Sequence, residues 1–111
     1  KSLNEGLESW DVSSITDMGL MFMGATNFNG NISHWDVRQV TNFGSMFQFA
    51  TNFNQDLSLW TTDSAAEIGF MFKFASSFKF FVRLIFSITK IGDITKHSPE
   101  LGIVSAFLVK E

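Results

Sequence analysis

The residues best suited to acid–base or metal chemistry are the histidines and the carboxylates near them. His34 and Asp36 lie two positions apart, so on an extended strand both side chains would point to one face. A metal or acid–base site needs a third partner, and the other histidine, His97, lies far along the chain. No Ser-His-Asp order, paired carboxylates or glycine-rich phosphate loop stands out. We therefore interpret these residues as a solvated polar face and expect no metal, no cofactor and no enzymatic activity.

Composition narrows the remaining classes of function. The 111 residues predict one domain, and a hydrophobic content of 45% is ample for a core. The chain has no cysteine, so neither a disulfide nor a thiolate metal site can form. A net charge of -3 argues against nucleic acid as a partner. The segment from Lys1 to Ser9 contains no apolar run and is not a signal peptide.

An internal repeat determines the secondary-structure elements that would position any functional site. Three units align without gaps over residues 10–34, 35–59 and 60–84, and residues 1–9 match the end of a unit. A fixed period of this length is typical of stacked repeat proteins. The same residue types return at the same offsets, and we expect these columns to be structural: Trp10, Trp35, Trp60, Met21, Met46, Met71, Phe22, Phe47, Phe72, Ala25, Ala50, Ala75, Phe28, Phe53, Phe78, Asn29 and Asn54.

The apolar spacing inside a unit changes halfway. The first half alternates, which predicts short parallel strands near Trp10–Val12, Trp35–Val37 and Trp60–Thr62. The second half has the i, i+3, i+4, i+7 spacing of one helix face, as in Phe43, Met46, Phe47 and Ala50. Helices should therefore begin near Thr16, Thr41 and Ser64.

Stacking such units would pair the strands into one parallel sheet, with the helices covering its other side. The sequence therefore predicts an α/β fold, a right-handed leucine-rich-repeat-like solenoid over residues 1–84. Asn29 and Asn54, with Asn4, recur one unit apart, which suggests stacked amides that close each turn onto the next. Gly44 and its equivalents in the other units indicate that a neighbouring backbone passes too close for a Cβ.

Two stretches, WDVSSITDMGLMFMGATNFNGNIS and WDVRQVTNFGSMFQFATNFNQDLS, follow the pattern W-D-V-S-x-V-T-x-M-x-x-M-F-x-x-A-x-x-F-N-x-x-I/L-S. This pattern resembles the BspA-like surface-protein repeat, and the match extends from Ser2 to about Phe78. The BspA-like family occurs in bacterial surface lipoproteins, including those of mycoplasmas, and in some protists and algae. The resemblance implies a leucine-rich-repeat solenoid, display at the cell surface or outside the cell, adhesion and partner binding. It attaches no enzymatic activity to the repeat.

The end of the chain departs from the repeat. Residues 85–111 begin with Ile85 where the next tryptophan is expected. Residues 78–91 are strongly apolar, but they are too few to span a membrane and include Lys79 and Arg83. Three interpretations stay open: a degenerate last coil that caps the stack, a segment lying on a membrane surface, or sequence from outside the true reading frame. Geometry favours the first.

The strand residues between the core positions should point outward on one face. The backbone fixes such a face while its side chains are free to vary, which makes it the usual place of partner contact in stacked repeats. A merely solvated surface is the equal alternative. The candidate partner-binding residues are Ser9, Asp11, Ser13, His34, Asp36, Arg38, Leu59, Thr61 and Asp63.

Two functions from different classes remain. The first is a non-enzymatic, surface-displayed module, a fragment of a longer array, which binds a protein or glycan through this face. The alternative is a purely structural spacer with no binding role of its own. We also expect the isolated chain to self-associate, because about three units are needed for a stable stack. The edge of the first unit would be covered only by Leu3 and Leu7.

Overall fold

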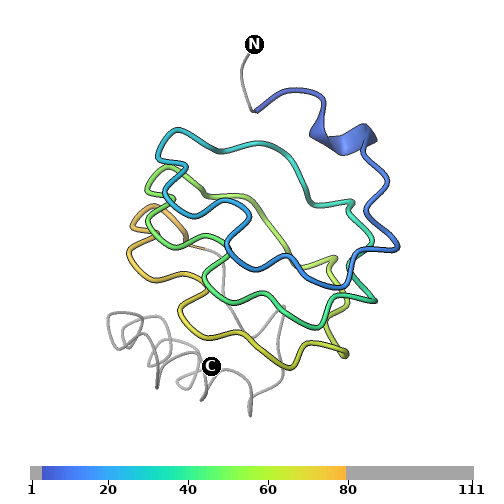
Figure 1. Cartoon of the computed structure of the whole chain (residues 1–111). Coiled ribbons are helices and arrows are strands. Elements are labelled where there is room, and N and C mark those ends of the chain that lie inside the picture. The colour runs from blue at the N-terminus through green and yellow to red at the C-terminus, as the bar shows by residue number, and fades with distance from the viewer. Residues whose placement is uncertain (1–3, 80–111) are drawn as a thin grey trace, which may run out of the picture.

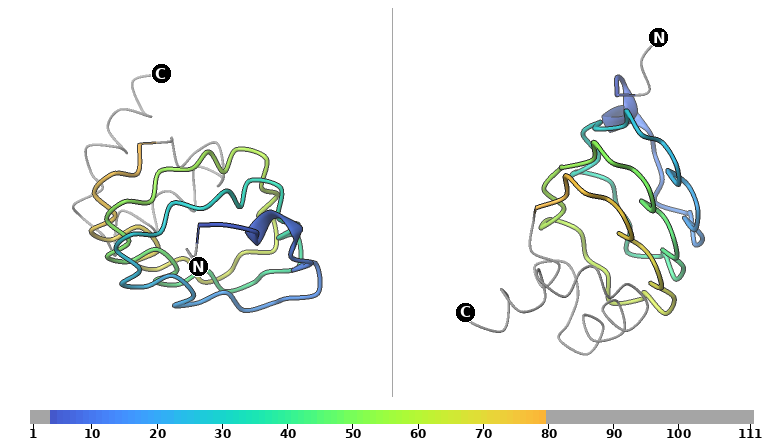
Figure 2. Two further views of the ribbon diagram at one scale, coloured as in Figure 1. Left: turned by 90° about the horizontal axis from the view of Figure 1, so that it is seen from above. Right: turned by 90° about the vertical axis from the view of Figure 1, so that its left-hand side faces the viewer.

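The computed structural model describes residues 4–79, which form successive coils stacked on one another (Figure 1). We name them coil 1 (residues 10–34), coil 2 (residues 35–59) and coil 3 (residues 60–79). Figure 2 shows the coils following one another along a single axis. Ahead of coil 1 lies the short 3-10 helix η1 (Leu7–Ser9), which is the one named element within the described residues.

The predicted α/β solenoid, with one strand and one helix in each unit, is wrong. Residues 4–79 contain neither a β-strand nor an α-helix. No strand forms at the predicted positions Trp10–Val12, Trp35–Val37 and Trp60–Thr62. Successions of turns replace the helices predicted to begin near Thr16, Thr41 and Ser64. Parallel pairing within the described chain consists of isolated bridges from Asp17 to Asn42 and from Asn42 to Glu67.

The backbone amides of each coil alternate between two kinds of acceptor. In coil 2, the amides of Met46, Gln48 and Ala50 donate to the carbonyl three residues earlier, at 2.9–3.2 Å. The intervening amides of Phe47 and Phe49 donate to coil 3, both at 2.9 Å. An α-helix would direct all of these amides along its own axis. A ribbon of turns instead leaves every second amide available to the next coil, and this is why no helix forms.

Both interfaces between coils use the same six backbone hydrogen bonds. Four run forward from alternate residues, and two run back to a single threonine carbonyl. Coils 1 and 2 are joined from Met18 to Asn42, Leu20 to Gly44, Phe22 to Met46, Gly24 to Gln48, Thr41 to Thr16 and Asn42 to Thr16, at 2.7–3.3 Å. Coils 2 and 3 are joined from Phe43 to Glu67, Ser45 to Gly69, Phe47 to Met71, Phe49 to Lys73, Ala66 to Thr41 and Glu67 to Thr41, at 2.7–3.0 Å.

The turn ribbon requires left-handed backbone at two positions in every coil. Side chains with a Cβ are disfavoured there, by roughly 1–2 kcal/mol per residue. Gly24 is the one glycine at these positions. The other five residues have φ between 56° and 66°, and they are Leu20, Ser45, Phe49, Phe70 and Phe74. The stacking hydrogen bonds must therefore compensate for local backbone strain.

The spacing that predicted a helix nevertheless identified the core. Phe43, Met46, Phe47 and Ala50 are all 0% exposed. A ribbon of turns returns the same side chains to its inner side as a helix would, so periodicity alone does not distinguish the two. The buried positions were thus predicted correctly, although the backbone that carries them was not.

Two columns of phenylalanine rings run along the core. Ring centroids in the first column are 5.7 Å apart between Phe22 and Phe47 and 5.6 Å apart between Phe47 and Phe72. A parallel column contains Phe28, Phe53 and Phe78, with centroids 5.6 Å and 5.8 Å apart. Within coil 2 the columns meet, because the Phe47 and Phe53 rings lie 4.1 Å apart. Offset stacking of this kind adds to the stabilisation from burial alone.

The tryptophan column ties the start of coils 2 and 3 to the chain 28 residues earlier. Trp35 Nε1 donates to the Leu7 carbonyl at 2.9 Å, and Trp60 Nε1 donates to the Ile32 carbonyl at 3.0 Å. Both side chains are 4% exposed. Trp10 stacks on Trp35 with centroids 6.5 Å apart, but it is 56% exposed. A buried indole N–H needs an acceptor, which η1 supplies to Trp35 and the end of coil 1 supplies to Trp60.

The predicted asparagine column is confirmed. Asn4 Oδ1 accepts the amide of Asn29 at 2.7 Å, and Asn29 Oδ1 accepts the amide of Asn54 at 2.8 Å. Asn54 Oδ1 accepts the amide of Lys79 at 2.9 Å. Each side chain thus satisfies the backbone one coil further on, which continues the stacking bonds where the turn ribbon ends.

The glycine column is tight for a reason other than the one predicted. A Cβ on Gly44 would lie 3.1 Å from Asn42 Oδ1 and 3.2 Å from Glu67 Cγ. The Gly69 carbonyl would lie at an ordinary distance of 3.6 Å. Asn42 Oδ1 accepts the Gly44 amide at 2.8 Å, so the side chain that crowds the glycine is also its hydrogen-bond partner. Side chains, and not a neighbouring backbone, therefore exclude the Cβ.

The predictions for the tail, residues 85–111, and for membrane contact by residues 78–91 lie outside the described residues, except at Phe78 and Lys79. Within residues 4–79, no helix is long and apolar enough to cross a membrane.

A pair of phenylalanines in coil 2 tests the core. Phe47→Ala should lower the free energy of unfolding by about 3–5 kcal/mol, because its buried ring contacts rings in coils 1 and 3. Phe49→Ala removes the same atoms from a side chain that is 42% exposed, and should cost about 1 kcal/mol. Urea denaturation measures both. Equal losses in the two variants would contradict the described stacking.

Candidate functional site

The nine residues predicted to form a partner-binding face lie at equivalent places in successive coils. Each is exposed or partly exposed, whereas the residues between them, such as Val12, Val37 and Thr62, are buried, with the exception of Trp10. The alternation of exposed and buried side chains was predicted on the assumption of a β-strand. It occurs here in extended chain that forms no strand. The exposed set consists of Ser9, Asp11, Ser13, His34, Asp36, Arg38, Leu59, Thr61 and Asp63.

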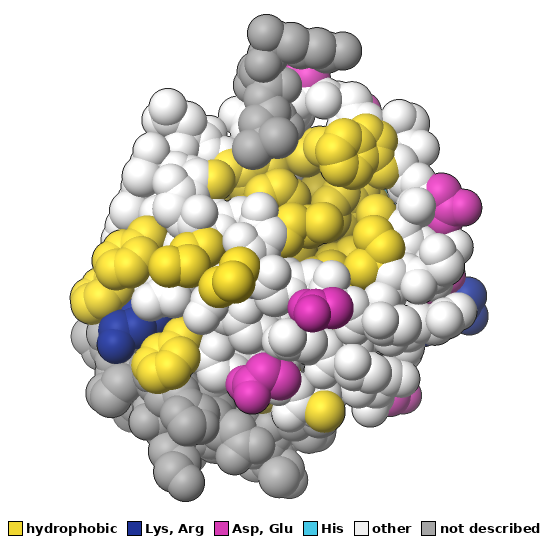
Figure 3. Space-filling view, in the orientation of Figure 1, with side chains coloured by type: hydrophobic (Ala, Val, Ile, Leu, Met, Phe, Trp, Pro, Cys, Tyr) yellow, Lys and Arg dark blue, Asp and Glu magenta, His cyan; other side chains and the backbone are white. Residues whose placement is uncertain are grey.

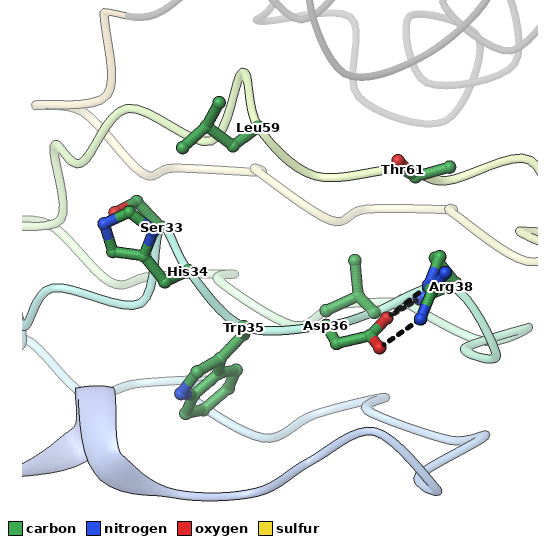
Figure 4. Close-up of a pocket in the computed structure, with 8 residues that line it drawn as sticks. Ser33, His34, Trp35, Asp36, Arg38, Leu59 and Thr61 are labelled. Atoms are coloured by element: carbon green, nitrogen blue, oxygen red, sulfur yellow. Dashed lines mark hydrogen bonds and ion pairs between the residues drawn. The ribbon is translucent and has the colours of Figure 1, made fainter.

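A shallow depression lies on this face between coils 2 and 3 (Figure 4). Its volume is about 280 Å³. Five of the nine predicted residues line it together with three neighbours: Ser33, His34, Trp35, Asp36, Val37, Arg38, Leu59 and Thr61. In Figure 4, Leu59 and Thr61 lie along one side and His34, Asp36 and Arg38 along the other, while the Trp35 indole points away. The structure thus brings part of the predicted face together around a concave surface.

Asp36 and Arg38 form a preorganised pair at one end of the depression. Arg38 donates from Nε to Asp36 Oδ1 at 2.9 Å, from Nη2 to Oδ2 at 2.8 Å, and from its backbone amide to Oδ1 at 3.2 Å. These hydrogen bonds lower the pKa of Asp36 to about 2. They also raise the pKa of Arg38. Both groups remain charged at neutral pH, and the exposed guanidinium is held in one orientation.

Coil 1 holds an aspartate in the same way with a neutral partner. Asp11 Oδ1 accepts the Ser13 amide at 3.0 Å and the Ser13 hydroxyl at 2.6 Å. These hydrogen bonds lower the pKa of Asp11. An aspartate that folds back onto the residue two positions later is a local turn device. The same device in coil 2 positions Arg38.

His34 and Asp36 do not form an acid–base pair. In Figure 4 the His34 imidazole lies near Ser33, and the Asp36 carboxylate faces Arg38. The described residues contain no group of three histidine, cysteine or carboxylate side chains able to hold a metal ion. The arrangement offers a concave shape, one charged pair and hydrogen-bond donors, all of which can contact a ligand.

A second exposed surface was missed by the sequence analysis, and we call it the apolar ridge. Phe49 and Phe74 stack with ring centroids 5.0 Å apart. Lys73 Nζ lies 5.0 Å from the Phe70 ring and 5.4 Å from the Phe74 ring. Figure 3 shows hydrophobic side chains gathered beside a basic one on the left of the view. The ridge consists of Leu20, Met23, Phe49, Phe70 and Phe74, which are 38–61% exposed.

Columns of identical residues could not reveal this ridge. Leu20, Ser45 and Phe70 share one offset in the repeat, and Gly24, Phe49 and Phe74 share another. The first column repeats no residue type, and the second has phenylalanine only in coils 2 and 3. The available signal was the recurrence of large apolar residues at offsets where the turn ribbon prefers glycine, which is readable only once the backbone is known.

The pH dependence of Asp36 tests the charged pair. Arg38→Gln should raise the pKa of Asp36 from about 2 toward its ordinary value of 3.8, because the side-chain hydrogen bonds of the guanidinium are lost. The lowered pKa stabilises the fold above about pH 3.8, and this stabilisation is lost as the pH falls toward 2. Carboxyl-carbon NMR titration measures the shift, with the exposed neighbour changed in Gln39→Ala as the control. An unchanged pKa in Arg38→Gln would refute the pair.

Comparison with known proteins gives one family. No curated protein and no solved structure matches the chain. Residues 1–96 match the family described as "Mycoplasma protein of unknown function, DUF285". The narrower resemblance to the BspA-like surface repeat stays a prediction. Because the match covers most of the chain and includes all of the stacked coils, the chain belongs to this Mycoplasma family of unknown function.

Proposed function

We propose that the chain is a non-enzymatic repeat module that binds a protein or glycan ligand at a cell surface. The ligand contacts the face formed by residues 9–13, 34–38 and 59–63. The depression between coils 2 and 3 is the observation that carries the proposal. Surface display and adhesion enter through the resemblance to the BspA-like repeat, and they belong to the proposal.

The chemistry around the depression suits recognition. Leu59 is 67% exposed and gives an apolar contact, while the Thr61 hydroxyl and the His34 imidazole give polar ones. Arg38 is held by Asp36, so little side-chain freedom is lost when a ligand engages it. Concave surfaces with an apolar wall and a few fixed polar groups are typical of ligand sites.

The spacer remains the second candidate, and a separate observation favours it. The same six hydrogen bonds join coils 1 and 2 and coils 2 and 3. An interface that repeats so regularly can extend through any number of coils and project another domain from a surface. A spacer needs no specific contact at the depression, so binding separates the two functions.

A binding measurement on the folded chain tests the proposal. The chain is applied to a glycan array and to a panel of purified extracellular-matrix proteins, and hits are titrated by biolayer interferometry. We expect saturable binding that Arg38→Ala combined with Leu59→Ala weakens at least about tenfold, because both side chains line the depression. Gln39→Ala, beside the depression, and Phe74→Ala, on the apolar ridge, should bind like the original chain.

Two outcomes would count against this function. Saturable binding that survives the Arg38 and Leu59 changes would place the ligand elsewhere. Absence of binding by the unaltered chain to every probe would favour the spacer. Thermal melts of all variants accompany the titrations, so that lost binding is not confused with lost folding.

A further inference from the structure

The apolar ridge is exposed because of the shape of each coil and not because of the ends of the stack. Phe49 lies in coil 2, which is bonded to coil 1 on one side and to coil 3 on the other, and it is still 42% exposed. Its equivalent Phe74 is 47% exposed in coil 3, and Gly24 is exposed in coil 1. This offset of the repeat therefore points outward in every coil. A further coil at either end of the stack would leave Phe49 at the surface.

Four of the five ridge residues lie where the backbone disfavours them. Their φ angles are 60–66°, and they are Leu20, Phe49, Phe70 and Phe74. Glycine and asparagine adopt this conformation at lower cost, and Gly24 occupies one of the equivalent positions. Burial does not compensate for the strain, because each of these side chains is more than a third exposed. Strained positions that carry large apolar side chains at the surface point to a role outside the fold.

The charge along the ridge is a single cation. The three repeat offsets that carry the ridge hold nine residues, with one lysine and no carboxylate among them: Leu20, Met23, Gly24, Ser45, Gln48, Phe49, Phe70, Lys73 and Phe74. The Lys73 ammonium lies over the rings of Phe70 and Phe74. A lysine of this kind packs its apolar stem against its neighbours and keeps its charge in water. The ridge therefore combines an apolar surface with one positive charge.

The size and shape of the ridge favour a soft partner. Figure 3 shows hydrophobic side chains standing out at the left edge of the molecule, beside a basic one. The depression described above lies at another part of the coils, around residues 33–38 and 59–61. A stable interface with a protein takes about 20–30 residues a side, and its anchors enter pockets. Five protruding side chains are too few for this, whereas a small apolar surface with a cation suits insertion into a lipid surface.

A second copy of the chain fits the ridge less well. In a symmetric pair, each ridge would meet the same ridge of the other copy, which brings the two Lys73 ammonium groups together. None of the nine positions has a carboxylate that could pair with them. A phospholipid supplies the missing negative charge in its phosphate, and its acyl chains accept the phenylalanine rings.

We propose that the apolar ridge is a contact site for the surface of a phospholipid membrane. Phe49, Phe70 and Phe74 enter the boundary between headgroups and acyl chains, and the Lys73 ammonium binds lipid phosphate. The contact is peripheral and reversible, because few side chains take part. It uses none of the residues of the ligand face, so it is independent of the function proposed above.

Sedimentation of the full chain with phospholipid vesicles tests the proposal. The vesicles contain phosphatidylcholine and phosphatidylglycerol in a molar ratio of about 2:1, and we expect saturable binding. Phe49→Asn combined with Phe74→Asn should weaken binding at least about tenfold, because two inserted rings are lost. Lys73→Gln should weaken it about three- to fivefold at low salt, with a smaller effect on vesicles of phosphatidylcholine alone.

Asparagine separates a binding role from a structural one. It adopts left-handed backbone more readily than phenylalanine, and the relief of strain offsets the lost ring stacking. The double variant should therefore keep its thermal midpoint within about 4 °C of the original while it loses vesicle binding. Lys73→Gln leaves the strained positions unchanged and gives a second measure. Trp10→Ala is the matched control, because this indole is 56% exposed outside the ridge and should not be needed for binding.

Three outcomes would overturn the lipid site. The first is no vesicle binding by the unaltered chain. The second is binding that persists in the folded double variant, or that falls equally in Trp10→Ala. The third is a dimer in sedimentation equilibrium that the double variant abolishes, without vesicle binding, which would assign the ridge to a second copy of the chain.

Discussion

The division of backbone amides between the coil that contains them and the coil that follows underlies the rest of this structure. Alternate amides close turns three residues long, and the amides between them reach the next coil. Because both sets are in use, neither a helix nor a conventional sheet can form over the same residues. The strained φ values of Leu20, Phe49, Phe70 and Phe74 follow from the same division. Local strain persists only where surrounding contacts fix the backbone, and here the neighbouring coils do so.

The core follows from this backbone because equivalent side chains of successive coils lie directly over one another. The centroids of equivalent phenylalanine rings lie 5.6–5.8 Å apart, and the ring planes differ by 2–10°. A layer of α-helices is wider, so it would not force equivalent rings this close together. Polar side chains also repeat from coil to coil. Asparagine Oδ1 atoms accept backbone amides on one side of the stack, and indole N–H groups donate to backbone carbonyls elsewhere. The bonds that join the coils are made without the side chains of the exposed face, which close only local turns, as Asp36 does with Arg38.

The sequence analysis identified the columns of buried side chains but predicted the wrong backbone conformation, and the reason is physical. Burial of Phe43, Met46, Phe47 and Ala50 depends on which side chains face inward, and their spacing states this directly. The choice between a helix and a turn ribbon depends on where amides donate, which side-chain types encode only weakly. Positions 45, 49, 70 and 74 have left-handed backbone but are not glycine, so the sequence does not indicate this conformation there. Part of the candidate site was predictable, since His34, Asp36, Arg38, Leu59 and Thr61 do line one depression. The apolar ridge was not, because Ser45 and Gly24 interrupt the two offsets of the repeat that carry most of its large apolar residues.

The indole that bonds to the chain 28 residues earlier has a consequence for how such a chain folds. Contacts between coils join residues 24 to 28 positions apart, from the amide ladder to the Trp35 and Trp60 bonds. This separation is set by the repeat and stays the same however many coils are stacked. Relative contact order therefore falls as an array grows, and the closure of one loop of fixed size is the elementary step at every stage. Each new coil supplies the carbonyls that accept four amides of its predecessor, so it can be added only to a coil that is already formed. Growth of the folded stack is thus sequential, and its slowest event is the formation of the first pair of coils.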